Sequence, residues 1–176
     1  MFEFNKIYDF KRHSNLLSPV FITSPHSGRI YPNEYIKITN FKKANLRTFE
    51  DCYIDKLYDF SQSLGVRSLI NLVPRIIIDL NRNNNEIDED MFINFSLNET
   101  VKTSRVLSGI GLFPRLMGSE KIYKEKPNWD FYQTLLENIY NIWHSKLIKE
   151  LHDLKSVFKE IVLLDCHSMP TIRQDG

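Results

Sequence analysis

Short apolar runs rich in β-branched residues recur along the chain, and proline, glycine or polar residues bound each of them. Such runs are typical of the buried strands of a parallel sheet. The pattern predicts strands near residues 18–24, 67–72, 76–80 and 160–164. Polar residues from 81 to 90 predict a surface loop after the third of these strands.

Between these runs, two segments carry apolar residues at helical spacing. The first, residues 50–64, ends at Gly65, a residue that commonly stops a helix. The second, residues 128–158, is long enough for an amphipathic helix that returns the chain to the last strand. Its predicted buried stripe consists of Phe131, Leu135, Ile139, Ile142, Trp143, Leu147, Leu151 and Leu154. This alternation favours one α/β domain with three α/β/α layers and a mostly parallel central sheet.

Composition narrows the range of partners. The 176 residues carry a formal net charge of +1, which gives no reason to expect nucleic acid or an anionic membrane as a partner. No apolar run reaches the roughly 18 residues that cross a bilayer, and the N-terminus lacks the apolar core of a signal peptide. Two cysteines are too few for a disulfide framework. We therefore expect a cytoplasmic protein with no membrane partner.

Two histidines occupy corresponding places at opposite ends of the chain. His26 lies in Ser24–Gly28, just after the first predicted strand, and His167 follows the last one. Loops at the carboxyl ends of strands build the active site of an open α/β sheet. Two imidazoles and a carboxylate are a common ligand set for a catalytic zinc ion, which keeps one position open for water. The pattern predicts a metal site.

The carboxylate can come from either of two adjacent residues, Glu50 and Asp51. Consecutive helical residues point about 100° apart, so only one of them should face the metal. The remaining histidines, His13, His144 and His152, are predicted to have no role in this site. His144 is the one that could approach it from the long helix.

Arginines provide candidate anion contacts. Arg75 and Arg82 flank the predicted strand at 76–80, and Arg115 follows a glycine turn. A guanidinium group binds a carboxylate through two parallel hydrogen bonds, which a lysine ammonium cannot do. We expect these arginines to bind an acidic ligand.

Five segments resemble, in order, the motifs of the N-formylglutamate amidohydrolase family. They are residues 19–28, 50–58, 74–82, 109–115 and 165–170. The resemblance extends from about residue 17 to residue 173. It implies the three-layer α/β fold of zinc carboxypeptidases and aspartoacylase-like deacylases.

The resemblance also implies roles for particular residues. The family's Asp-x-x-x-Asp-x-Leu-Tyr pattern selects Asp51 as the zinc ligand beside His26 and His167. Asp55 and Asp165 would support these ligands from outside the coordination shell. A second implication concerns Asn81 and Arg82, which look like the carboxylate-binding Asn-Arg pair of zinc carboxypeptidases.

The implied activity is zinc-dependent hydrolysis of the amide of N-formylglutamate or a related N-acyl amino acid. Family members continue beyond the last histidine motif, so the resemblance implies that residues 1–176 form a domain without the family's C-terminal part. We therefore expect the general base to lie beyond Gly176. We also expect an exposed sheet edge, which is prone to pair with another chain. Two alternatives stay open: an inactive, shortened family member, and a metal-binding interaction module that associates with itself or with a complementing chain.

Overall fold

A computed structural model describes residues 4–13, 15 and 18–169. Its main sheet has four strands in the order β1 (Tyr8–Lys11), β3 (Arg67–Asn71), β2 (Val20–Ser24) and β6 (Val162–Asp165). β2 pairs in parallel with both β3 and β6, whereas β1 runs antiparallel to β3. The mostly parallel sheet predicted from the sequence is confirmed.

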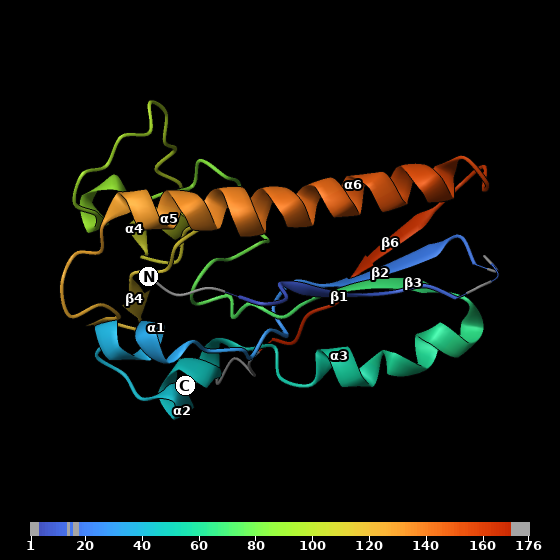
Figure 1. Cartoon of the computed structure of the whole chain (residues 1–176), viewed down its shortest axis with the longest axis horizontal. Coiled ribbons are helices and arrows are strands. Elements are labelled where there is room, and N and C mark those ends of the chain that lie inside the picture. Colours follow the sequence, from blue (N-terminus) through green and yellow to red (C-terminus); the bar gives the residue numbers. More distant parts are fainter. Residues whose placement is uncertain (1–3, 14, 16–17, 170–176) are drawn as a thin grey trace, which may run out of the picture.

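Helices cover both faces of this sheet, as Figure 1 shows. The long helix α6 (Asn141–Lys155) lies over one face, and α3 (Ile54–Leu57) with the 3-10 segment η2 (Asp59–Leu64) lies over the other. α5 (Trp129–Leu135) and the π-helical segment η4 (Leu136–Tyr140) lead directly into α6. The predicted three-layer α/β class is therefore confirmed.

The remaining elements are short. They are α1 (Asn33–Ile38), α2 (Lys43–Leu46), η1 (Arg47–Phe49), η3 (Glu89–Met91), α4 (Ser104–Leu107), β4 (Leu116–Met117) and β5 (Glu120–Lys121). The last two pair as a small antiparallel sheet. No helix in the described part of the chain has both the length and the apolar character needed to cross a membrane.

The core lies between the sheet and the long helix and continues into an aromatic cluster beside α5. Phe92, Phe113 and Tyr132 meet there with ring centroids 5.0–5.9 Å apart, and Trp129 is fully buried against them. The predicted stripe of the long helix is buried at Leu135, Ile139, Trp143 and Leu154. Ile142 is 44% exposed instead, because its neighbour Trp143 continues the buried stripe and adjacent helical residues point about 100° apart.

The strand predicted at 76–80 does not form. Pro74 starts a turn in which its carbonyl accepts hydrogen bonds from the amides of Ile77 and Ile78. The three isoleucines at 76–78 are nevertheless fully buried. A short, continuous apolar run indicates burial, but it does not distinguish a strand from other buried backbone.

The helix predicted at 50–64 is also wrong in its extent. Tyr53 adopts a left-handed conformation with φ of 64°, and α3 begins only after it. Glu50 and Asp51 therefore lie in a loop and not on a helix. Gly65, with φ of 71°, ends the helical region as predicted.

The last strand differs from its prediction in burial. Val162, Leu163 and Leu164 in β6 are 49%, 42% and 43% exposed, whereas a buried strand was expected. The reason is its position: within the described residues, β6 pairs with β2 on one side and forms the edge of the sheet on the other. The family-like segment at 165–170 begins with the last residue of β6 and ends at Pro170, which lies outside the described residues.

Candidate metal centre

Two neighbouring strands deliver the two histidines to one place. β2 and β6 run in parallel, and His26 and His167 each follow the carboxyl end of their strand by two residues. Their rings consequently lie with centroids 4.7 Å apart. The backbone turn around His26 depends on Gly28, because a Cβ atom at that position would lie 2.2 Å from the carbonyl oxygen of Val73.

Asp51 joins the histidines from the loop before α3. Its amide donates a hydrogen bond of 3.0 Å to the carbonyl of His26, which fastens the loop beside the end of β2. Its Oδ2 atom lies 3.4 Å from Nδ1 of His26 and 2.9 Å from Nδ1 of His167. Donor atoms of the three residues all lie within 4.8 Å of one another. Two histidines and one carboxylate are a ligand set that catalytic zinc sites commonly use.

Glu50, the other candidate carboxylate, faces a different partner. Both of its side-chain oxygens accept from Nε of Arg47 at 3.2 Å. Of the two adjacent carboxylates, the geometry therefore brings Asp51 to the histidines.

A carboxylate contacts Nε2 of each imidazole ring, on the side away from Asp51. Nε2 of His26 lies 2.6 Å from Oδ1 of Asp79, and Nε2 of His167 lies 2.9 Å from Oδ2 of Asp165. Asp165 is itself held by the hydroxyl of Thr23, which donates to Oδ1 at 2.7 Å. With Nε2 bonded to a carboxylate, each ring presents Nδ1 to the cluster. Metal-binding histidines are commonly oriented in this way.

An unpartnered atom of His26 also suits the binding of a metal ion. Nδ1 of His26 is buried and has no hydrogen-bond partner within the described part of the chain. A buried polar atom without a partner is costly. A cation bound by Nδ1 of His26 and by Oδ2 of Asp51 would give Nδ1 the partner that it lacks.

Asp79 is the functional residue that sequence reasoning missed. It is only 1% exposed and contacts His26, Nη2 of Arg75 at 2.8 Å and Nη2 of Arg82 at 3.3 Å. Its Oδ1 also accepts from the amide of Asn81 at 3.0 Å. The available signal was an aspartate directly after a buried apolar run, inside the third family-like segment.

The charged side chains of the centre shift one another's pKa values. Burial raises the pKa of Asp79, but His26, Arg75 and Arg82 outweigh it and hold that pKa well below its usual range. The pKa of Asp51 is lowered in the same way, against the effect of burial, by His26, His167 and Arg75. Burial lowers the pKa of His26, whereas Asp51 and Asp79 raise it to a net upward shift. Both carboxylates are therefore ionised at neutral pH.

A pocket of about 410 Å³ opens beside the centre. It is lined by Asp51, Arg75 and Asp79 together with Glu50, Ile110 and Pro114. Arg75 is thus the predicted anion contact that faces this pocket, with 23% of its side chain exposed. Asn81 lies at the histidine instead, since its Nδ2 is 3.3 Å from Nε2 of His167.

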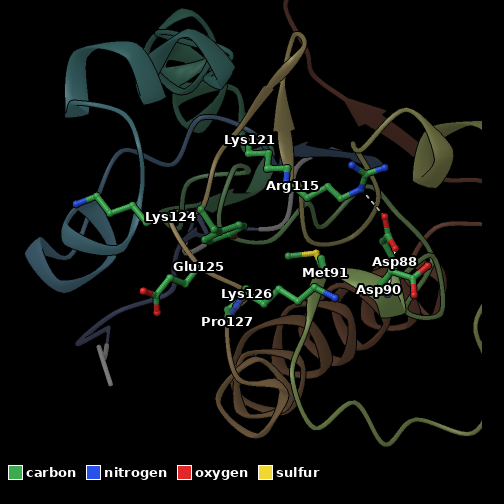
Figure 2. A pocket seen from close by; sticks show the side chains of 10 residues that line it. Asp88, Asp90, Met91, Arg115, Lys121, Lys124, Glu125, Lys126 and Pro127 are labelled. Carbon is green, nitrogen blue, oxygen red and sulfur yellow. Dashed lines mark hydrogen bonds and ion pairs between the residues drawn. The ribbon is translucent and has the colours of Figure 1, made fainter.

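The other two arginines are engaged elsewhere. Arg82 donates from Nε to the carbonyl of Ile110 at 3.1 Å and from Nη1 to that of Asn81 at 2.8 Å, and its side chain is 8% exposed. Arg115 pairs with Asp88 in a separate pocket, drawn in Figure 2. The structure does not place Arg115 beside the histidines.

Asp55 and His144 also have partners outside the cluster. Asp55 forms an ion pair with Arg29, and Nε2 of His144 lies 3.1 Å from the carbonyl oxygen of Leu80. Asp55, expected to support the ligands from outside the coordination shell, lies on α3, whereas Asp51 lies in the loop before that helix. Asp55 does not contact either histidine directly in the described structure.

Several known proteins resemble this chain in fold and in sequence. A crystal structure of N-formylglutamate amidohydrolase from Ralstonia eutropha JMP134 superposes with a TM-score of 0.87 at 24% identity, covering 93% of this chain and 58% of that one. At that identity the likeness establishes the fold. The N-formylglutamate deformylase of Pseudomonas aeruginosa is 28% identical over 94% of this chain, and that of Pseudomonas putida is 29% identical over 86%.

The extent of these matches defines what is shared. The aligned regions cover 56% and 52% of the two Pseudomonas proteins, so the chain spans about half the length of these curated relatives. Residues 18–176, nearly the whole chain, match the family model described as N-formylglutamate amidohydrolase. With the motif order and the fold in agreement, the chain belongs to the N-formylglutamate amidohydrolase family.

Proposed function

We propose that this chain carries the zinc-binding part of a hydrolase that cleaves the amide of N-formylglutamate or a related N-acyl amino acid. The observation that carries the proposal is the convergence of His26, Asp51 and His167, with donor atoms within 4.8 Å of one another. The names of the two Pseudomonas relatives support the same reaction class. The two cysteines, neither in a disulfide, agree with a cytoplasmic location.

The chain's own residues would bind the ion and hold the ligands in place. Asp79 and Asp165 accept from Nε2 of the two imidazoles and so keep Nδ1 of each available for binding. Zinc bound there would supply a Lewis acid that lowers the pKa of water and polarises an amide carbonyl.

We further propose that Arg75 binds a carboxylate of the substrate. Its guanidinium lines the pocket beside Asp51, and the side chain is partly exposed there. Arg82 has a different proposed role, because its guanidinium already bonds two carbonyls and Asp79. It would hold Asp79 while Asp79 holds His26.

Replacing Arg75 by Lys should weaken the binding of L-glutamate to the zinc-loaded protein by about ten-fold. Lysine keeps the positive charge near Asp51 and Asp79 but loses the two-pronged contact, and a hydrogen bond to a charged group typically contributes about 1.5–3 kcal/mol. Calorimetric titration would measure this. Arg105→Lys, at an exposed site on α4, is the matched control. Equal affinity in the two variants would remove Arg75 from the binding pocket.

A second candidate function rests on the edge of the sheet. The side chains of Val162, Leu163 and Leu164 are apolar and exposed along β6, where an additional strand could pair. We propose that a polypeptide complementing the unmatched part of the relatives binds there, with self-association as the competing use of the same edge.

One experiment separates these proposals. Zinc content and formate release from N-formylglutamate would be measured for the chain alone, and again after adding the part of the Pseudomonas aeruginosa protein that this chain does not match. We expect about one zinc per chain in both samples. Formate release from the chain alone would establish a complete enzyme, and release only after the addition would support complementation. Absence of zinc from the protein, even after adding it back, would contradict the proposed metal site.

A further inference from the structure

Arg29 links the two loops that supply the first pair of proposed ligands. It lies three residues after His26, and its Nη2 atom donates to Oδ2 of Asp55 at the start of α3. The same guanidinium lies over the ring of Tyr53, 5.7 Å from the ring centroid. One side chain from the His26 loop therefore contacts the residues that follow Asp51 at two points.

The loop that Arg29 grips is conformationally strained. Tyr53 has φ of 64° and ψ of 8°, the left-handed conformation that L-residues other than glycine, asparagine and aspartate seldom adopt. Such a conformation costs on the order of 1–3 kcal/mol and persists only where surrounding contacts impose it. Tyr53 is 62% exposed, so burial in the core does not impose it. Its contacts are with Arg29 over the ring, with Arg47, and with the amides of Lys56 and Leu57, which donate to its carbonyl; of these, only Arg29 comes from the His26 loop.

The other side of the link is rigid. Gly28 packs directly against the backbone of Val73, and the amide of Ile30 donates to the carbonyl of Leu72 at 3.2 Å. Arg29 therefore projects from a segment that is anchored on both sides to the chain after β3. Through its contacts with Asp55 and Tyr53, Arg29 can therefore hold the loop that contains Asp51 in place.

We infer that Arg29 is a positioning residue that holds Asp51 against His26 before any metal binds. The inference rests on the proposed function for the identity of the metal. Asp55, predicted as a supporting residue of the site, acts in this arrangement through Arg29. The link acts in parallel with the hydrogen bond from the Asp51 amide to the His26 carbonyl.

The structure offers a closely matched control pair. The side chains of Arg29 and Asp55 are 33% and 16% exposed, and those of Arg115 and Asp88, paired in the separate pocket, are 32% and 15% exposed. Removing either arginine therefore breaks an ion pair of similar burial, but only Arg29 connects the ligand loops.

The test compares Arg29→Ala, Arg29→Lys and Arg115→Ala. Zinc affinity would be measured by competition with a chelator, and hydrogen exchange of the Asp51 amide would be followed by NMR in zinc-free protein. We expect Arg29→Ala to weaken zinc binding about ten-fold, at the lower end of losses for residues behind a metal ligand. Its Asp51 amide should exchange faster, whereas the Leu112 amide, bonded to Glu86 at 2.7 Å, should not change. Arg29→Lys should recover part of both losses, and Arg115→Ala should match the unchanged protein.

The two measurements keep the inference separate from the proposed function. Failure of the unchanged protein to bind zinc would refute the metal site, and the exchange rate of the Asp51 amide would then decide the role of Arg29. The inference is overturned if that amide exchanges at the same rate in Arg29→Ala and Arg115→Ala, or if both variants lose zinc affinity equally. If Arg29→Ala does not fold, Arg29→Lys allows the same comparison.

Discussion

Asp79→Asn should reduce the free energy of unfolding of the zinc-free protein by about 3–5 kcal/mol, the typical cost of breaking a buried charge pair on one side. The carboxylate is 1% exposed and is surrounded by His26, Arg75 and Arg82. An amide of nearly the same shape would remove the carboxylate that contacts all three groups, and Asp51 would remain near His26 and Arg75 only. The same substitution should lower zinc affinity by about 10- to 100-fold, because His26 loses the carboxylate that orients it.

Urea denaturation followed by tryptophan fluorescence would measure the change in stability. Asp88→Asn is the matched control, since it removes a carboxylate from the more exposed pair with Arg115 and should cost about 1 kcal/mol or less. The loss of unfolding free energy caused by Asp79→Asn should become smaller as the pH falls. The pKa of Asp79 is depressed on folding, so its contribution is present above pH about 4 and is lost as the pH falls further. Equal stability of Asp79→Asn and the unchanged protein at pH 7 would contradict this account.

Removal of either histidine from the cluster should have the largest effect on metal binding. We expect His26→Ala and His167→Ala each to lower zinc affinity by more than about 100-fold, because losing a ligand should cost more than losing the residue behind it. The reason is geometric: the remaining two donors of the group His26, Asp51 and His167 cannot complete a three-ligand site.

Metal analysis after dialysis against a weak chelator would measure this loss. His144→Ala is the control, because His144 faces the carbonyl of Leu80 and the ring of Tyr140. Its zinc content should stay near that of the unchanged protein. Full zinc content in both His26→Ala and His167→Ala would place the metal elsewhere.

Hydrophobic periodicity predicted the elements that carry the site. The strands before His26 and His167 and the strand at 67–71 lie where the apolar runs indicated them. The long helical region was predicted from its stripe, since a 3.6-residue period over many turns is a strong local signal. β1 was missed, because Tyr8–Lys11 is a short edge strand in which apolar and charged residues mix.

The sequence alone also narrowed the set of residues that can form the metal site. Histidines after two predicted parallel strands imply two imidazoles at one edge of a sheet, and the resemblance to the family's Asp-x-x-x-Asp-x-Leu-Tyr pattern selected Asp51. Periodicity could not reveal that Asp51 reaches the histidines from a loop. That placement depends on the left-handed Tyr53 and on a hydrogen bond between distant backbone segments.

The amino-acid sequence by itself determined three strands of the main sheet, the long helical region, the resemblance to the family and the two strand ends that carry histidines. These properties follow from local periodicity and from motif spacing, which need no knowledge of distant contacts. Only the tertiary structure decided that Asp79 joins His26 to Arg75 and Arg82 and that Arg115 faces Asp88. It also decided that, among the described residues, β6 forms an exposed edge of the sheet. These outcomes depend on which distant segments pack together, because the partner of a charged side chain is set by proximity in space and not by separation along the chain.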